Sequence, residues 1–317
     1  GNIMFLHNSL TPRRDPRYDW RQYLPGDDSS LIWKENLSFS QLPQVVNPKS
    51  GFVHSANQTP FNVTAPADNP RLEDYAPGHG FQMDMTNRAQ RGLELFAELG
   101  PISEAEFSAI KHDKYYSLNA PYVPYLQQIA ATQFAEPKLV EAQALLASWD
   151  LGTDLDNKAA ALGTCVFLTA ERDDQRAAHS EQQIAELLGG CVDKLMVAKG
   201  RIDPPWGEVN RHVRGELNLP VAGGPDILRA IYGRGIEDNG YLTNVAGDGL
   251  YYLVSWDADG TQKVEGVHQF GSATLDATSP HYGDQAEDYA KEIMHDPLFD
   301  AARLQGNLQR VYAPGDE

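Results

Sequence analysis

The spacing of apolar residues along the chain divides it into three regions. Residues 1–85 carry short apolar runs, such as 29–33 and 51–54, between turn-forming Pro, Gly, Asn and Asp residues. This pattern predicts short strands joined by long ordered loops. Long loops in a compact domain tend to be functional, so we expect this region to cover a site.

The pattern becomes helical between residues 86 and 200. Apolar residues recur there every three or four positions with charged residues between them, which is the spacing of a helix packed on a core. Ser103 and Glu106 form a capping box, and Pro137 has the position of a first-turn proline. We expect helices over residues 86–99, 103–111 and 180–198, and another that begins at 137.

Residues 201–317 are expected to return to strands and to end in a polar tail. Residues 241–245 and 250–256 are largely apolar, and Asp257-Ala258-Asp259-Gly260 then turns the chain into residues 263–269. This is a hairpin signature. One short amphipathic helix is expected over residues 286–295. Antiparallel strands with separate helices predict an α+β fold.

Composition narrows the classes of function. The 317 residues carry a net charge of -18, so the surface would repel a phosphate backbone and no nucleic-acid partner is expected. No apolar run reaches the roughly 20 residues of a membrane helix, and no membrane span is expected. Cys165 and Cys191 are either two free core thiols or one disulfide, which would indicate an oxidising compartment.

Most motifs of known catalytic chemistry are missing from the sequence. No G-x-S-x-G, P-loop, G-x-G-x-x-G, H-E-x-x-H or C-x-x-C occurs, and no two histidines have helical ligand spacing. The loop that begins at Asp257 starts like a calcium-binding EF-hand, but His268 stands where the twelfth position needs Glu. The residues alone therefore indicate an α+β protein without an assigned chemistry.

Three stretches in order resemble a known family: residues 42–60 (LPQVVNPKSGFVHSANQTP), 206–226 and 267–285. The first resembles the penicillin acylase pattern P-x-V-x-N-P-x-S-G-[YF]-[IV]-x-x-x-N-x-x-P. The other two, with WGEVNR, LPVAGGPD, VHQFGS and SPHYGDQ, look like the branch of acyl-homoserine-lactone and lipopeptide acylases. The resemblance implies an N-terminal nucleophile hydrolase: an αββα sandwich of antiparallel sheets with helical layers, of which residues 1–317 form a single domain.

The resemblance also implies roles for particular residues. The family's first Asn after the G-[YF]-[IV] strand donates its amide to the oxyanion hole, and this position is Asn57. The family's orienting Arg matches Arg88, for which Arg91 is a competing candidate. Some relatives bind a structural calcium about eleven positions after the Asn, where Asp68 stands, with a loop turn as the alternative. No other cofactor is expected, and His281 is assigned no catalytic role.

The same resemblance implies that part of the protein lies outside this sequence. The family's nucleophile is a Ser, Thr or Cys at the start of the β-subunit, whose own α-amine acts as the base. Gly1 has no such side chain, and residues 1–5 instead fit an internal strand. We therefore expect the larger part of a catalytic β-subunit, inactive alone and without its upstream strands. Its partners would be an α-chain and the upstream β-chain segment.

Three functions remain open at this point. The first is an amidohydrolase for acyl-homoserine lactones or acylated peptides, in the periplasm or secreted. The second is a penicillin-type β-lactam side-chain acylase, and the third is a non-catalytic fragment or scaffold with the same fold. Trp33 and Phe52 are candidates for the acyl pocket of an enzyme, or else belong to the core.

Overall fold

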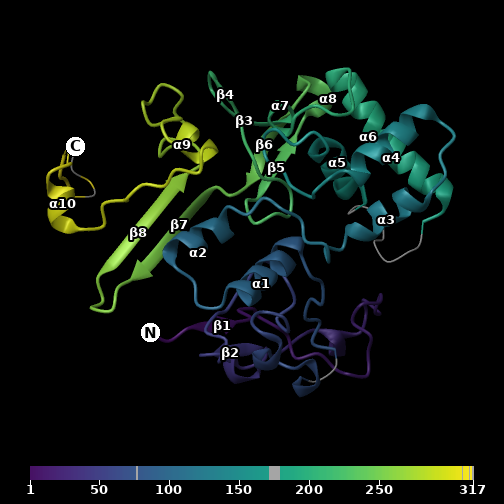
Figure 1. The fold of residues 1–317 in the computed structure, drawn as a ribbon. Coiled ribbons are helices and arrows are strands. Elements are labelled where there is room, and N and C mark those ends of the chain that lie inside the picture. The colour runs from purple at the N-terminus through teal and green to yellow at the C-terminus, as the bar shows by residue number, and fades with distance from the viewer. Residues whose placement is uncertain (76–77, 171–178, 309, 314, 316–317) are drawn as a thin grey trace.

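Figure 1 shows a computed structural model of the chain, which describes residues 1–75, 78–170, 179–308, 310–313 and 315. Residues 1–75 and 78–85, coloured purple to dark blue, lie together on one side of the first helix, α1 (Asn87–Leu99). They form mostly loops and one small antiparallel sheet, in which β1 (Met4–Leu6) pairs with β2 (Gln44–Val46). The expectation of short strands and long ordered loops is confirmed for this region.

Two apolar runs predicted as strands in this region are not strands. Ser29–Leu31 form a 3-10 turn, η1, because the Asp28 side chain accepts a hydrogen bond from the N–H of Ser30. In residues 51–54 the N–H of His54 donates to the carbonyl of Val63 in a neighbouring loop instead of to a strand. Three further 3-10 turns lie in this loop-rich region: η2 (Phe39–Gln41), η3 (Pro66–Asp68) and η4 (Leu72–Asp74).

The middle region is helical, as predicted. The expected helices are α1, α2 (Glu104–Lys111), α4 (Pro137–Ala147) and α6 (Glu181–Lys199). The capping box of Ser103 with Glu106 is formed at α2, and Pro137 lies in the first turn of α4. Residues 171–178 of the predicted helical region lie outside the described residues.

Two helices of this region were not predicted: α3 (Val123–Ala131) and α5 (Ala160–Ala170). Most residues of α5 are buried, so it has no polar face from which a helical period could be recognised. A disulfide between Cys165 and Cys191, with Cα atoms 5.8 Å apart, joins α5 to α6. Of the two alternatives for the cysteines, the disulfide is confirmed and the free thiols are wrong.

The last third of the chain contains a four-stranded sheet and a separate hairpin (Figure 1). The predicted hairpin pairs β7 with β8 antiparallel, from Leu250 opposite His268 to Trp256 opposite Gln262. The sheet has the order β4-β3-β6-β5, and its β3–β6 pair is parallel, which departs from the all-antiparallel prediction. The strands are β3 (Asn210–Arg214), β4 (Leu217–Pro220), β5 (Ile231–Arg234), β6 (Leu242–Gly247), β7 (Leu250–Trp256) and β8 (Gln262–His268).

The helix predicted over residues 286–295 is shorter than expected. It ends at Ala290 because Gly266 and His295 exchange both main-chain hydrogen bonds, at 2.8 Å each, and so draw the following residues onto β8. This helix is α9 (Ala286–Ala290), and the other short helices of this part are α7 (Trp206–Val209), α8 (Ile236–Asn239) and α10 (Ala301–Gln305). Helices and mainly antiparallel strands together confirm the α+β class, whereas the single-domain division stays a prediction.

Candidate functional site

Asn57 lies in a loop next to the start of α1. Its φ of 62° is left-handed, a conformation that Asn adopts more readily than most residues. Thr86, the N-cap of α1, donates its hydroxyl to the carbonyl of Ala56 at 2.8 Å and accepts a hydrogen bond from the N–H of Ala89 at 3.1 Å. One side chain therefore joins the Asn57 loop to the helix that carries Arg88.

Arg88 connects Asn57 to a buried acidic residue. Its Nη2 donates to Asn57 Oδ1 at 3.1 Å, and its Nε donates to Asp226 Oδ1 at 3.1 Å. Because a guanidinium can only donate, the Asn57 atom that faces it must be the oxygen. The Nδ2 group of Asn57 is thus turned away from Arg88 and keeps its two N–H donors for another acceptor.

Arg91, the competing candidate, has a different partner. Its Nε and Nη2 donate to the two carboxylate oxygens of Asp113, at 3.1 and 2.9 Å. The structure therefore brings Arg88 and not Arg91 to Asn57.

Asp226 is a residue of this site that was not predicted from the sequence. Its Oδ2 accepts hydrogen bonds from the main-chain N–H of Asn87 at 2.7 Å and from the hydroxyl of Tyr122 at 3.1 Å. Its carbonyl accepts from Asn87 Nδ2 at 2.7 Å. The signal for it was the Gly-Gly-Pro-Asp end of the second family stretch, since such a turn places a carboxylate on a sharply bent chain.

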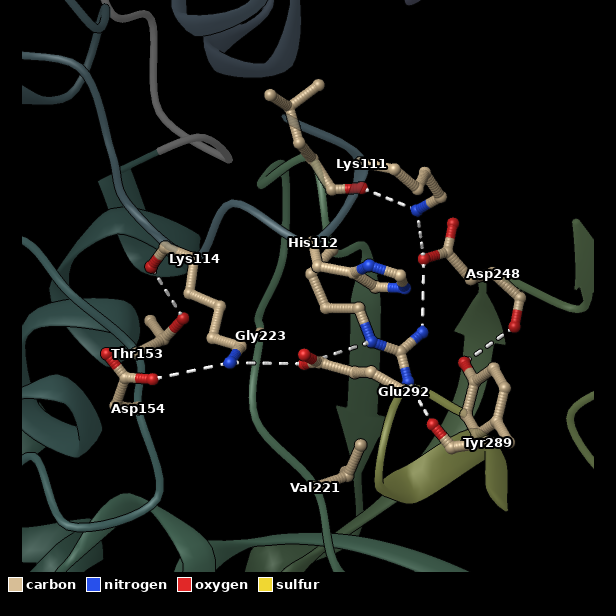
Figure 2. A network of polar contacts seen from close by, with 12 residues as sticks. Lys111, His112, Lys114, Thr153, Asp154, Val221, Gly223, Asp248, Tyr289 and Glu292 are labelled. Carbon is tan, nitrogen blue, oxygen red and sulfur yellow. Dashed lines mark hydrogen bonds and ion pairs between the residues drawn. The ribbon is translucent and has the colours of Figure 1, made fainter. Parts of the chain in front are cut away.

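A charged network anchors the loop that carries Asp226 (Figure 2). The side chain of Arg229 is fully buried, and its Nη1 lies 3.2 Å from Asp248 Oδ2. Lys111 of α2 donates to the same oxygen at 2.6 Å, while Glu292 lies 3.8 Å from Arg229 Nε. These contacts join α2 and the segment after α9 to the loop before β5.

His54 is the titratable neighbour of the site. It is partly buried, and a Cβ added to Gly92 of α1 would lie only 2.8 Å from its Nε2. Burial lowers the pKa of His54, because a charged imidazole loses its hydration there. The neutral ring therefore places no second positive charge beside Arg88 at neutral pH.

Comparison with known proteins identifies the family. Residues 1–306 match the family model of penicillin amidase. The chain belongs to the penicillin amidase family. Its fold is also similar to that of the thermostable penicillin G acylase from Alcaligenes faecalis in orthorhombic form, with a TM-score of 0.57 and 17% sequence identity. The match covers 99% of this chain but 65% of that chain, so the chain spans less than two thirds of its structural relative.

Asp68, the candidate calcium ligand of this penicillin amidase family member, lies in η3 and accepts a hydrogen bond from the N–H of Ser50 at 2.8 Å. Among the described residues, no group of three or more His, Cys, Asp or Glu side chains could hold a metal ion. Calcium binding at Asp68 stays a prediction.

The side chain of His281 contacts Asp284 in its own segment and not Asn57. Its Nδ1 is 2.8 Å from Asp284 Oδ2, and both side chains are largely exposed. The neighbouring Tyr282 carbonyl accepts from Arg214 of β3, so this segment packs on the four-stranded sheet.

Among the described helices, none combines the length and the apolar character needed to cross a membrane.

Proposed function

We propose that the chain is the larger part of the β-subunit of an amidohydrolase, in which Asn57 stabilises the oxyanion formed during cleavage of an N-acyl amide. The observation that carries this proposal is the Arg88–Asn57 hydrogen bond of 3.1 Å, which turns the amide N–H groups away from the guanidinium. A preoriented N–H donor of this kind lowers the barrier to a tetrahedral intermediate by about 3 kcal/mol.

The nucleophile comes, in this proposal, from a segment that the sequence does not contain. Asn57 is exposed, and the main cavities of the described residues do not include it. The structural relative is longer, since the match covers 65% of it. An upstream β-chain segment and an α-chain would cover Asn57, so that it lines a cavity, and would supply a terminal Ser, Thr or Cys.

The reaction would proceed in two steps. The terminal hydroxyl or thiol attacks the amide carbonyl, and the α-amine of the same residue takes its proton. The amine product leaves with a proton, and water then hydrolyses the acyl-enzyme. Asn57 Nδ2 donates to the oxyanion in both steps, while Arg88 holds the amide in position from the opposite side.

For the substrate we favour acyl-homoserine lactones or acylated peptides, because residues 206–226 and 267–285 resemble that branch of the family. A penicillin-type side-chain acylase is the second candidate, favoured by the penicillin G acylase as structural relative. Release of the acyl acid from amides of graded chain length would separate the two, since a long acyl preference would contradict the second.

A periplasmic or secreted location is part of the proposal. The Cys165–Cys191 disulfide supports it, because such bonds persist mainly in oxidising compartments.

The test of the proposal is Asn57→Ala in the complete protein. We expect kcat to fall by about a hundredfold or more, with maturation followed by gel electrophoresis so that failed self-cleavage is not mistaken for lost turnover. The matched control is Asn62→Ala, in the same loop, whose amide contacts Met85 Sδ and which should keep kcat. A loss smaller than about tenfold in mature Asn57→Ala would exclude the assigned role.

A further inference from the structure

The largest of the main cavities in the described residues lies in the loop region before α1. Its volume is about 730 Å³, and it does not include Asn57. This size is within the range of small-molecule sites, which are mostly apolar with a few polar groups. Aromatic side chains make up much of its wall: Tyr18, Trp20, Tyr75 and Phe81.

Arg14 contributes a cation to this aromatic wall. Its Cζ lies 5.2 Å from the ring centroid of Trp33, and its Nε is buried without a hydrogen-bond partner among the described residues. Gly80 allows this position, because a Cβ there would collide with the guanidinium, and its φ of 71° favours glycine. A buried N–H without an acceptor costs free energy, and a guanidinium that lines a cavity offers its other N–H groups to an anion bound there.

The other charged side chains of the wall already have partners. Arg21 Nε lies 3.1 Å from Asp19 Oδ1, and Glu73 lies 3.7 Å from Arg71. Within the part of the chain that the structure describes, Arg14 has no such carboxylate. The cavity therefore offers one cation whose charge is not neutralised in place.

His79 adds a second polar group beside Arg14. Its Nδ1 is buried without a partner among the described residues, and its ring lies 5.4 Å from Phe81. Burial and the nearby Arg13 and Arg14 charges lower the pKa of His79. A neutral imidazole can still donate one hydrogen bond to an anion held by the guanidinium.

We propose that this cavity binds a small monocarboxylate with an aromatic or apolar body. The carboxylate pairs with the Arg14 guanidinium, whose planar fork matches its two oxygens, and the body of the ligand packs on Tyr75 and Phe81. The site is separate from the proposed acylase centre and does not depend on it.

The probes for this site are 3-phenylpropanoate and its uncharged analogue 3-phenylpropanol, titrated into the protein by calorimetry and tryptophan fluorescence. We expect saturable binding of the acid to one site, and binding of the alcohol weaker by about tenfold or more, because only the acid satisfies the guanidinium. Arg14→Gln should weaken acid binding by about tenfold as well. The matched control is Arg21→Gln, on the same wall but paired with Asp19, which should change the affinity by less than about threefold.

Three results would overturn the proposal: equal binding of acid and alcohol, an unchanged affinity in folded Arg14→Gln, or no saturation by the acid below about 10 mM. The comparison of the two probes uses the unmodified protein, so it holds even where Arg14→Gln does not fold. Asn57→Ala should leave acid binding unchanged, and a loss of binding in that variant would place the ligand at the acylase centre instead.

Discussion

Asn57 and Asp226 share an unusual main-chain conformation, with φ of 62° and 53°. Such positive angles are uncommon outside glycine, but Asn and Asp tolerate them better than other residues. Both side chains bond to Arg88, Asn57 through its oxygen and Asp226 through Oδ1. Asn and Asp at these two positions therefore fit the main-chain geometry and also supply the polar atoms that bind Arg88.

The Arg88–Asp226 ion pair leads to a prediction for a single-residue variant. Asp226→Asn keeps the shape of the side chain and its tolerance of positive φ, but removes the charge that holds Arg88. We expect kcat of the complete protein to fall by about tenfold or more, because in the proposed function Arg88 fixes the Asn57 amide and Asp226 holds Arg88. Steady-state kinetics of the mature enzyme measures this.

The chain provides a closely matched control for that variant. Arg91 lies on the same helix as Arg88 and forms an ion pair with Asp113. The side-chain exposures of the two pairs are the same, 24% for the arginine and 10% for the aspartate. Asp113→Asn should lower the unfolding temperature comparably and leave kcat unchanged. Equal kinetic losses in the two variants would show that Asp226 acts only through stability.

Among the elements, α5 and α6 show how the surroundings decide the effect of a glycine. Gly163 lies within the buried helix α5, where an added Cβ would collide with the ring of Trp149. Gly190 lies on an exposed position of α6, where an added Cβ would meet no atom within 4 Å. Helix propensity favours alanine at both positions, by about 1 kcal/mol.

We therefore expect opposite effects from the same substitution. Gly190→Ala should stabilise the protein by about 0.5–1 kcal/mol, which is the propensity gain. Gly163→Ala should destabilise it by about 1–3 kcal/mol, because overpacking of the core outweighs that gain. Urea unfolding at equilibrium measures both changes, and stabilisation by Gly163→Ala would contradict the packing around Trp149.

At the scale of the whole molecule, His212 joins the four-stranded sheet to the C-terminal segment. It is fully buried, its Nε2 donates to the carbonyl of Gln269 at 2.5 Å, and its ring stacks on Phe270 at 5.1 Å. Burial lowers the pKa of His212, as it does those of His54 and His112. The unfolded chain therefore takes up protons near pH 6.5 that the folded chain does not.

The direction of the pH effect follows from this difference. The stability contributed by the neutral histidines is complete above about pH 7.5, and it is lost as the pH falls through the unfolded-state value of about 6.5 toward the lowered folded-state value. In His212→Gln, whose amide can still donate to Gln269, the free energy of unfolding should fall less between about pH 7.5 and 5.5. Urea unfolding at several pH values measures this, and an unchanged pH slope would exclude the contribution of His212.

Much of the fold could be predicted because its signals are local. The capping box at Ser103, the first-turn Pro137 and the turn after Trp256 each act within a few residues, and α2, α4 and the β7–β8 hairpin form where these signals stand. The apolar run at residues 29–33 predicts a strand but forms the 3-10 turn η1 instead, because the Asp28 side chain caps that turn.

The candidate site was predictable in part, for a different reason. Asn57 and Arg88 followed from the order of family stretches, whereas nothing in the spacing of residues indicated that Asp226 would reach Arg88 across 138 positions. The choice between Arg88 and Arg91 also needed coordinates, since the two residues lie three positions apart on one helix and face different carboxylates.

The amino-acid sequence by itself determined the helix caps, the hairpin turn, the acidic surface and the family, because each depends on neighbouring residues or on overall composition. The tertiary structure alone decided the disulfide between α5 and α6, the parallel pairing of β3 with β6 and the carboxylate that holds Arg88. These features join residues far apart in the chain, and their free energy depends on how the elements pack and not on local propensity.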